Sequence, residues 1–196
     1  CDEGEILING EPVKDIAKLR NSISVIFQDY AKYRTYIKEN ITVGDVNRTY
    51  TDDDIRDAAR QTDIDSYIET LDDKYDTKLG CFSDNYLDLS GGQWQKLALS
   101  RLLFKNDAKM MILDEPTASL DPLAEADIYA NFFHLTKDKT ALFISHRLGI
   151  TKVVDRILVF RDGTVAEQGT HDELVAVDGL YRRFVVERKQ AAGWKV

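Results

Sequence analysis

Short, unbroken apolar runs are spaced along the chain, and apolar residues recur every three or four positions in several of the segments between them. Unbroken runs of this length predict buried strands. The expected strands lie at residues 24–27, 110–113, 140–144 and 157–160. Helical spacing predicts a helix that buries one side over residues 94–103, and a second helix over residues 123–135. Because strands alternate with helices, the pattern predicts an α/β fold with a largely parallel sheet.

The remaining segments are shorter and more polar. We expect a strand and turn at 4–10, a connector with a helical turn at 13–20, helices at 37–41, 55–61, 64–71 and 147–154, a polar linker at 75–88, a strand at 164–168 after an Asp162-Gly163 turn, and one or two helices at 172–190. Thr51 and the three aspartates after it predict the N-cap and first turn of a helix, because both stabilise the amide groups at a helix start. Capping is favoured over a metal site for these aspartates.

Ser90, Gly91, Gly92 and Gln93 stand where the helix over residues 94–103 begins. Ser90 is a favoured N-cap residue. Two glycines at a helix start let the backbone come close to another group, and the exposed N–H donors favour an anion such as phosphate. Ser-Gly-Gly alone is equally well explained as a turn that leads into an amphipathic helix.

Polar residues follow three of the expected strands. Gln28 follows the first, Asp114 and Glu115 follow the second, and His146 follows the third. Each has a simple explanation as part of a polar turn. In open α/β sheets, however, ligands bind at the carboxyl ends of the strands, so we expect these four side chains to converge on one crevice.

Composition limits the classes of function. The chain has 196 residues, of which 43% are hydrophobic, enough for one domain with a sizeable core. A formal net charge of −8 argues against a nucleic-acid partner, because the phosphate backbone calls for a basic face. Two cysteines, Cys1 and Cys81, are too few for a disulfide framework or a zinc site and favour a reduced, cytosolic setting. No apolar stretch reaches the roughly 18 residues of a membrane span, so we expect a soluble chain.

Leu89-Ser90-Gly91-Gly92-Gln93 resembles the signature of ATP-binding-cassette (ABC) ATPases, and the other motifs follow in that family's order. The run that ends in Asp114 and Glu115 is similar to a Walker B strand. An Asp at such a strand tip holds Mg²⁺, and a carboxylate beside it orients the water that attacks a γ-phosphate. Asp114 then serves as the metal ligand and Glu115 as the catalytic carboxylate.

The resemblance assigns the other roles. Gln28 matches the Q-loop glutamine, which touches the Mg²⁺ or the attacking water, and His146 matches the switch histidine at the γ-phosphate. Asp121, in Ala118-Ser119-Leu120-Asp121, matches the D-loop, which reaches across a dimer interface. ATP and Mg²⁺ are the implied ligands. The implied partner is a second ABC ATPase domain, in a homodimer or heterodimer, whose site is completed by Ser90, Gly91, Gly92 and Gln93.

The implied fold is a P-loop NTPase (RecA-like) ABC core with a helical subdomain. The core is expected at residues 1–28 and 106–196, and the helical subdomain with the signature at 29–105. The stretches at 36–41, 144–148 and 169–174 are similar to the exporter branch, in which the ATPase adjoins membrane helices. This likeness implies contact with a transmembrane domain's coupling helices, at the cytoplasmic face of the cell membrane.

The sequence departs from the family in what it lacks. It contains no Gly-Lys pair, so the Walker A loop is absent, and we interpret residues 1–196 as an N-terminally truncated ABC ATPase domain. The intact protein is expected to hydrolyse ATP, and this chain alone to be inactive. Cys81 stands where exporters usually have Glu, and Trp94 where a basic residue is common. The alternatives are a soluble ABC-type ATPase clamp in repair or translation, and a non-hydrolytic fragment.

Overall fold

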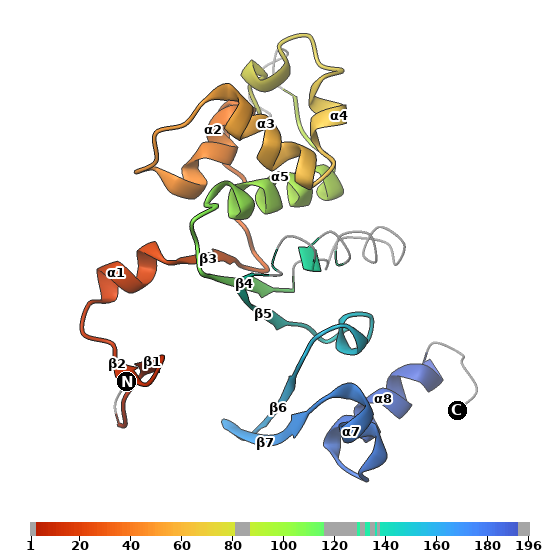
Figure 1. Cartoon of the computed structure of the whole chain (residues 1–196). Coiled ribbons are helices and arrows are strands. Elements are labelled where there is room, and N and C mark those ends of the chain that lie inside the picture. Colours follow the sequence, from red (N-terminus) through yellow and green to blue (C-terminus); the bar gives the residue numbers. More distant parts are fainter. Residues whose placement is uncertain are drawn as a thin grey trace. The chain divides into compact units, whose positions relative to one another are not determined.

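The computed structural model describes residues 3–80, 87–115, 129, 132–133, 136 and 138–191. It divides into two compact units, Cys1–Ile144 and Ser145–Val196. Figure 1 labels the helices and strands of both units.

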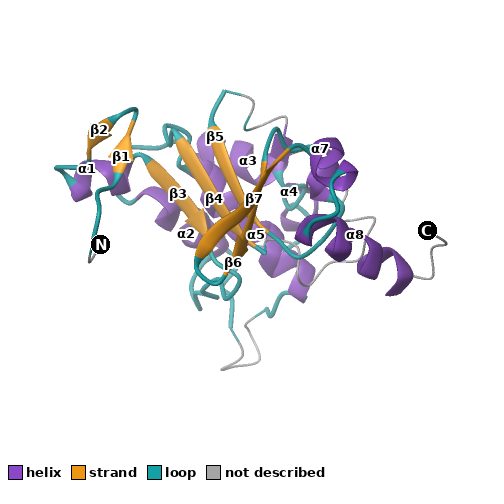
Figure 2. Cartoon of the chain, turned by 90° about the horizontal axis from the view of Figure 1, so that it is seen from below, coloured by secondary structure: helices purple, strands orange, loops and turns teal. Residues whose placement is uncertain are grey.

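Three described strands of the first unit form a parallel sheet in the order β3-β4-β5. They span Ile23–Ile26, Met110–Asp114 and Thr140–Ile144, and Figure 2 shows them side by side with helices behind. The expected strands at 24–27, 110–113 and 140–144 are therefore present within one residue at each end. The parallel pairing confirms the α/β class with a mainly parallel sheet.

One face of this sheet is buried and the other is open among the described residues. Ile26, Met111 and Leu113 are at most 4% exposed, whereas Val25 and Ile144 are 38% and 48% exposed. Successive strand residues point to opposite faces, so an unbroken apolar run places hydrophobic side chains on both. The expectation of a buried strand therefore holds for β4, in which no residue is exposed, and fails at Val25 of β3.

Helix α5, Gly91–Phe104, covers the buried face of the sheet. Ala98, Leu99 and Leu102 pack in the cluster with the strand residues. Trp94 and Leu97 pack instead in a second cluster formed with the other helices. The predicted helix is therefore present but is buried on two sides, not one, because it lies between the sheet and a helical lobe (Figure 1).

We use the name helical lobe for the elements between β3 and α5. They are α2 (Ile37–Thr42), the 3₁₀ turn η1 (Val43–Asp45), α3 (Asp52–Gln61), α4 (Asp65–Ile68) and the 3₁₀ turn η2 (Lys74–Asp76). Thr51 is the expected N-cap of α3, and it forms a capping box with Asp54. The helix predicted over 64–71 is only the short α4. The predicted linker 75–88 contributes Tyr75 and Leu79 to the lobe's core, so it is more than a connection.

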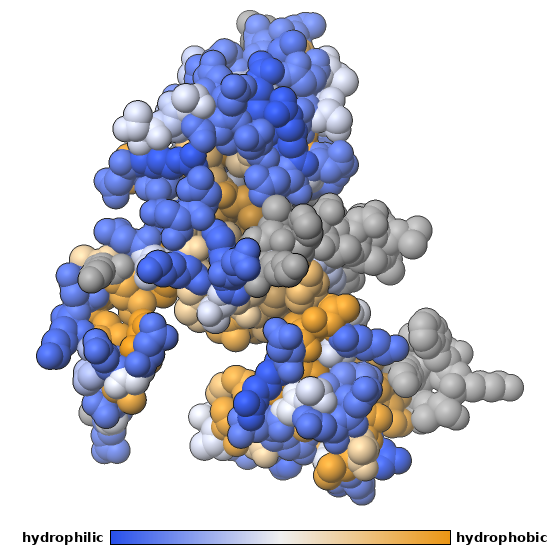
Figure 3. Space-filling view, viewed as in Figure 1, coloured by the Kyte–Doolittle hydropathy of each residue, from blue (hydrophilic) through white to orange (hydrophobic). Residues whose placement is uncertain are grey.

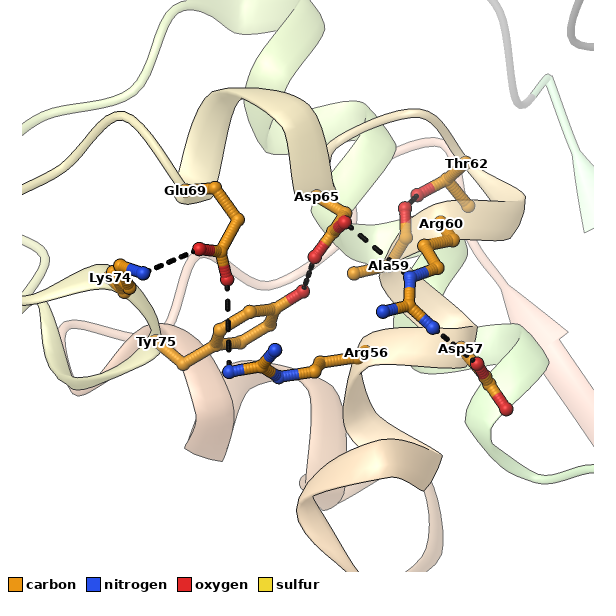
Figure 4. Close-up of polar contacts among 9 residues, drawn as sticks. All are labelled: Arg56, Asp57, Ala59, Arg60, Thr62, Asp65, Glu69, Lys74 and Tyr75. Carbon is orange, nitrogen blue, oxygen red and sulfur yellow. Dashed lines mark hydrogen bonds and ion pairs between the residues drawn. The ribbon is translucent and has the colours of Figure 1, made fainter.

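A polar network ties α3, α4 and η2 together at the rim of the helical lobe (Figure 4). The Tyr75 hydroxyl donates to Asp65, which also faces Arg60 at 3.6 Å. Glu69 pairs with Lys74 at 2.7 Å and faces Arg56 at 3.8 Å. Burial and the neighbouring Asp65 carboxylate raise the pKa of Tyr75 far above its usual value. The face of the lobe seen in Figure 3 is mostly hydrophilic.

A hairpin and a short helix precede β3. Strands β1 (Leu7–Ile8) and β2 (Glu11–Pro12) pair antiparallel. Asn9 and Gly10, with φ of 53° and 81°, make the two-residue turn, a conformation that Asn-Gly adopts readily. Helix α1, Ile16–Asn21, is the predicted helical turn of the connector.

The second unit has its own antiparallel pair, β6 (Ile157–Arg161) and β7 (Thr164–Gly169), joined by the predicted Asp162-Gly163 turn. Helices α7 (His171–Ala176) and α8 (Leu180–Ala191) follow. Residues 147–154 were expected to be helical, but the only helical part is the 3₁₀ turn η3, Ile150–Lys152. Leu174, Tyr181 and Val185 form this unit's core.

Several predictions fall outside the described residues. They include Cys81, Asp121 and most of the helix predicted over 123–135. The division into a core and a helical subdomain at residues 28 and 105 stays a prediction.

Candidate functional site

The parallel pairing brings Gln28 and Asp114 to the same edge of the sheet. Asp114 is the last residue of β4, and Gln28 lies in the turn two residues beyond the end of β3. Since Ile26 pairs with Leu113, both residues follow aligned strand ends. This edge is the carboxyl end of the sheet, where α/β folds bind ligands.

Glu115 leaves the strand with an unusual backbone. Its φ is 45°, in the left-handed region that few residues other than glycine adopt. Its N–H donates to the Ile144 carbonyl on β5 at 2.9 Å, which continues the β4–β5 pairing by one bond. A non-glycine residue held in this region indicates a position that the surrounding structure enforces. The chain thus turns sharply at a carboxylate directly after Asp114.

A capping box fixes the start of α5. The Gln93 N–H donates to Ser90 Oγ at 3.3 Å, and the Ser90 N–H donates to Gln93 Oε1 at 2.8 Å. Within the described residues, no hydrogen bond engages the N–H groups of Gly91 and Gly92. The first turn carries no acidic side chain. These two donors at the positive end of a 14-residue helix suit an anion.

Trp94 anchors the segment that leads into the start of α5. Its side chain is 3% exposed, and its Nε1–H donates to Asp88 Oδ1 at 3.1 Å, two residues before the N-cap. The indole therefore packs in the helical lobe while its one polar atom ties down the segment that leads into Ser90. This contact gives Trp94 a structural role that the sequence alone did not reveal.

Arg101 joins α5 to the segment after Gln28, and no prediction from the sequence named it. Its guanidinium donates to Asn40 O at 2.9 Å, to Asn40 Oδ1 at 3.1 Å and to Ala31 O at 3.1 Å. It lies 4.6 Å from the centre of the Tyr33 ring. Burial lowers the pKa of Arg101 from its usual value. A charged residue among the leucines that end α5 was the signal that could have singled it out.

The remaining candidates cannot be placed beside these residues. His146 is the second residue of the second unit, Ser145–Val196, and its meeting with the sheet edge stays a prediction. Asp121 lies outside the described residues. His171 begins α7 after the Thr170–Glu173 capping box, and its Nδ1 lies 2.7 Å from the Tyr181 hydroxyl.

The oxygen-bearing side chains at the sheet edge are suitable ligands for a magnesium ion. Mg²⁺ prefers oxygen ligands and is usually held by one or two carboxylates together with substrate phosphates and water. Asp114 and Glu115 supply carboxylates, and Gln28 supplies an amide oxygen from the neighbouring strand end. In the described ranges, no group of three or more His, Cys, Asp or Glu residues is placed to hold a metal by itself.

Comparisons with known proteins identify the family of the chain. A family model described as "ABC transporter" matches residues 1–118. The chain is 41% identical over 183 residues to the subtilin transport ATP-binding protein SpaT of Bacillus subtilis, covering 92% of this chain and 30% of that protein. It is 38% identical over 182 residues to the ATP-dependent lipid A-core flippase of Hahella chejuensis, again covering 92% of this chain and 30% of the relative.

Among solved structures, a bacterial Atm1-family ABC exporter with ATP bound matches with a TM-score of 0.85 and 32% identity, over 95% of this chain and 32% of that one. The chain belongs to the ABC transporter family and has the α/β fold of its ATPase domains. It spans about 30% of the length of the curated relatives it matches. None of the described helices is long and apolar enough to cross a membrane.

Proposed function

We propose that the protein containing this chain hydrolyses ATP to power an ABC exporter. The observation that carries the proposal is the carboxyl edge of the sheet, where β4 ends at Asp114, Glu115 follows, and the neighbouring turn holds Gln28. Relatives named as transport ATP-binding proteins and exporters support the same function.

Each residue at this edge has a role in the proposed hydrolysis. Asp114 and Gln28 hold the Mg²⁺ that neutralises charge on the phosphates of the substrate. Glu115 orients the attacking water and accepts its proton, as the reaction needs a group that positions the nucleophile in line with the leaving oxygen. The enforced backbone at Glu115 favours this role, because it fixes the point from which the carboxylate side chain extends. His146 has the role of contacting the γ-phosphate.

The capped start of α5 binds the γ-phosphate of a partner's nucleotide. Ser90 and Gln93 hold the helix start in shape, while the N–H groups of Gly91 and Gly92 face an anion. A second ABC ATPase domain, in a homodimer or heterodimer, brings that nucleotide, and Asp121 reaches across the same interface. ATP closes the dimer, and hydrolysis reopens it.

The helical lobe transmits this motion to the coupling helices of a transmembrane domain, at the cytoplasmic face of the membrane. The division into a core at 1–28 and 106–196 and a subdomain at 29–105 belongs to this proposal. The sequence contains no Gly-Lys-Ser/Thr loop to cradle the phosphates of a nucleotide. Residues 1–196 alone are therefore inactive.

The test is ATP hydrolysis by the intact transporter polypeptide that contains these residues and a Walker A loop. Glu115→Gln should abolish turnover while ATP binding persists, because the amide keeps the shape of the carboxylate but cannot accept a proton. The isolated chain should show no hydrolysis. Full turnover by Glu115→Gln, or Glu115-dependent hydrolysis by the isolated chain, would show the assignment to be wrong.

A further inference from the structure

The segment that follows Gln28 is fastened to α5 at two separate places. The Tyr30 hydroxyl donates to the Gly91 carbonyl at 3.3 Å, at the first residue of α5. The Ala31 carbonyl accepts from Arg101 Nη1 at 3.1 Å. Gly91 and Arg101 are about 15 Å apart along the helix. Residues 30–31 are therefore held both to the start of α5 and to a point nearly three turns further on.

Arg101 also holds the far end of the same segment. Its guanidinium lies over the Tyr33 ring and donates twice to Asn40 of α2. Asn40, which is fully buried, donates in turn to the carbonyls of Tyr33 and Tyr36 at 2.9 and 3.1 Å. The contacts form a closed network between α5, α2 and the segment that leaves Gln28.

Only an arginine satisfies this arrangement. The planar guanidinium directs donors at three acceptors at once while its face rests on a ring, and a lysine ammonium cannot match that geometry. Tyr30 adds to the attachment because its ring packs against both hydrophobic clusters, the one at the sheet and the one in the helical lobe.

We propose that Arg101 is a positioning residue that clamps residues 30–33 to α5, so that the turn with Gln28 and the helix start at Ser90 move as one body. The inference rests on the proposed function, in which Gln28 serves the chain's own site and Ser90 serves a partner's site. When the metal and nucleotide displace Gln28, the start of α5 then moves with it by the same amount.

The first experiment tests the clamp without reference to catalysis. Hydrogen exchange in the intact transporter should be faster for the amides of residues 30–36 in Arg101→Lys, by about tenfold or more, because their attachment opens more often. Arg48→Lys is the matched control. Arg48 also donates to an α5 carbonyl, Phe104 O at 2.7 Å, and lies over the Phe104 ring, but it does not contact residues 30–33. Unchanged exchange at residues 30–36 in Arg101→Lys would overturn the clamp.

The second experiment tests whether Arg101 acts through Gln28. Arg101→Lys should lower kcat by about tenfold and raise the Mg²⁺ concentration for half-maximal ATPase activity, since small displacements of positioned groups are costly to turnover. The milder variant Tyr30→Phe should shift both quantities in the same direction. In a Gln28→Ala background, Arg101→Lys should have little further effect on kcat.

Additive losses in the Gln28→Ala background, or equal losses in Arg48→Lys, would refute action through Gln28. Failure of the proposed function is a separate result. It would appear as absence of ATP hydrolysis in the unmutated transporter, whereas the hydrogen-exchange comparison would still decide the clamp.

Discussion

Gly44 gives the sharpest test of how the helical lobe is packed. It lies in η1, where the chain passes over the end of α5. A Cβ added at Gly44 would lie 2.1 Å from the backbone oxygen of Arg101 and 3.0 Å from its carbonyl carbon. An ordinary contact of this kind is about 3.4 Å, so η1 and α5 would have to separate by more than an ångström.

Two opposing free-energy terms decide whether Gly44→Ala stabilises or destabilises the fold. Replacing Gly with Ala in a helical turn gains about 0.5–1 kcal/mol, because the unfolded chain loses freedom. Forcing extra volume between packed backbones costs about 1–3 kcal/mol, and here the upper part of that range applies because a carbonyl group of a helix cannot rotate away. Gly44→Ala should therefore lower the free energy of unfolding by about 2 kcal/mol.

Urea denaturation followed by Trp94 fluorescence measures this loss, in a Trp194→Phe background so that only one tryptophan reports. The midpoint should fall by about 1 M with an unchanged slope. Val46→Ala, at a side chain that is 77% exposed, is the control and should change stability by less than about 0.5 kcal/mol. A Gly44→Ala midpoint equal to or above that of the unmutated chain would refute the close approach of η1 to α5.

Three further predictions concern other parts of the chain. Gly179→Ala should destabilise the second unit, because the new Cβ would lie 2.3 Å from the Glu167 carboxylate, which accepts the first N–H groups of α8. Glu167→Ala should lower the thermal unfolding temperature by a comparable amount. The hydrogen bond from the Thr170 backbone N–H holds the pKa of Glu173 below its usual 4.5. The ionised carboxylate therefore stabilises the fold fully above that pH, and this contribution is lost as the pH falls below it. Glu173→Gln should make the melting temperature, followed by circular dichroism, less sensitive to acid. Tyr75→Phe should cost about 1–2 kcal/mol in urea denaturation because the hydrogen bond to Asp65 is lost, and an unchanged midpoint would mean that the bond contributes nothing.

Features that depend on a few neighbouring residues could be predicted from the sequence. The N-caps predicted at Thr51 and Ser90 both form, because each joins residues three positions apart. The turns at Asn9-Gly10 and Asp162-Gly163 form for the same local reason. The strand ends that carry Gln28 and Asp114 were also predictable, since apolar runs stop where polar residues begin.

Features that depend on distant contacts could not be predicted. Arg101 and Ala31 are 70 residues apart in the sequence, and no local pattern joins them. The helix predicted over 64–71 ends early at Ile68, where Leu71 turns back toward Ile68 and Tyr75 enters the core. The burial of α5 on two sides also depends on packing, because periodicity indicates which residues are apolar and not what surrounds them.

The sequence by itself determined the chemistry that this chain offers: two carboxylates after one strand, a glutamine after another, and a capped, glycine-rich helix start. Only the tertiary structure decided that β3 and β4 are parallel neighbours in register, which brings Gln28 and Asp114 to one edge. It also decided that α5 is fastened to the segment after Gln28. The physical reason is that side-chain type is a property of each residue, whereas register and long-range hydrogen bonds exist only once the chain has folded.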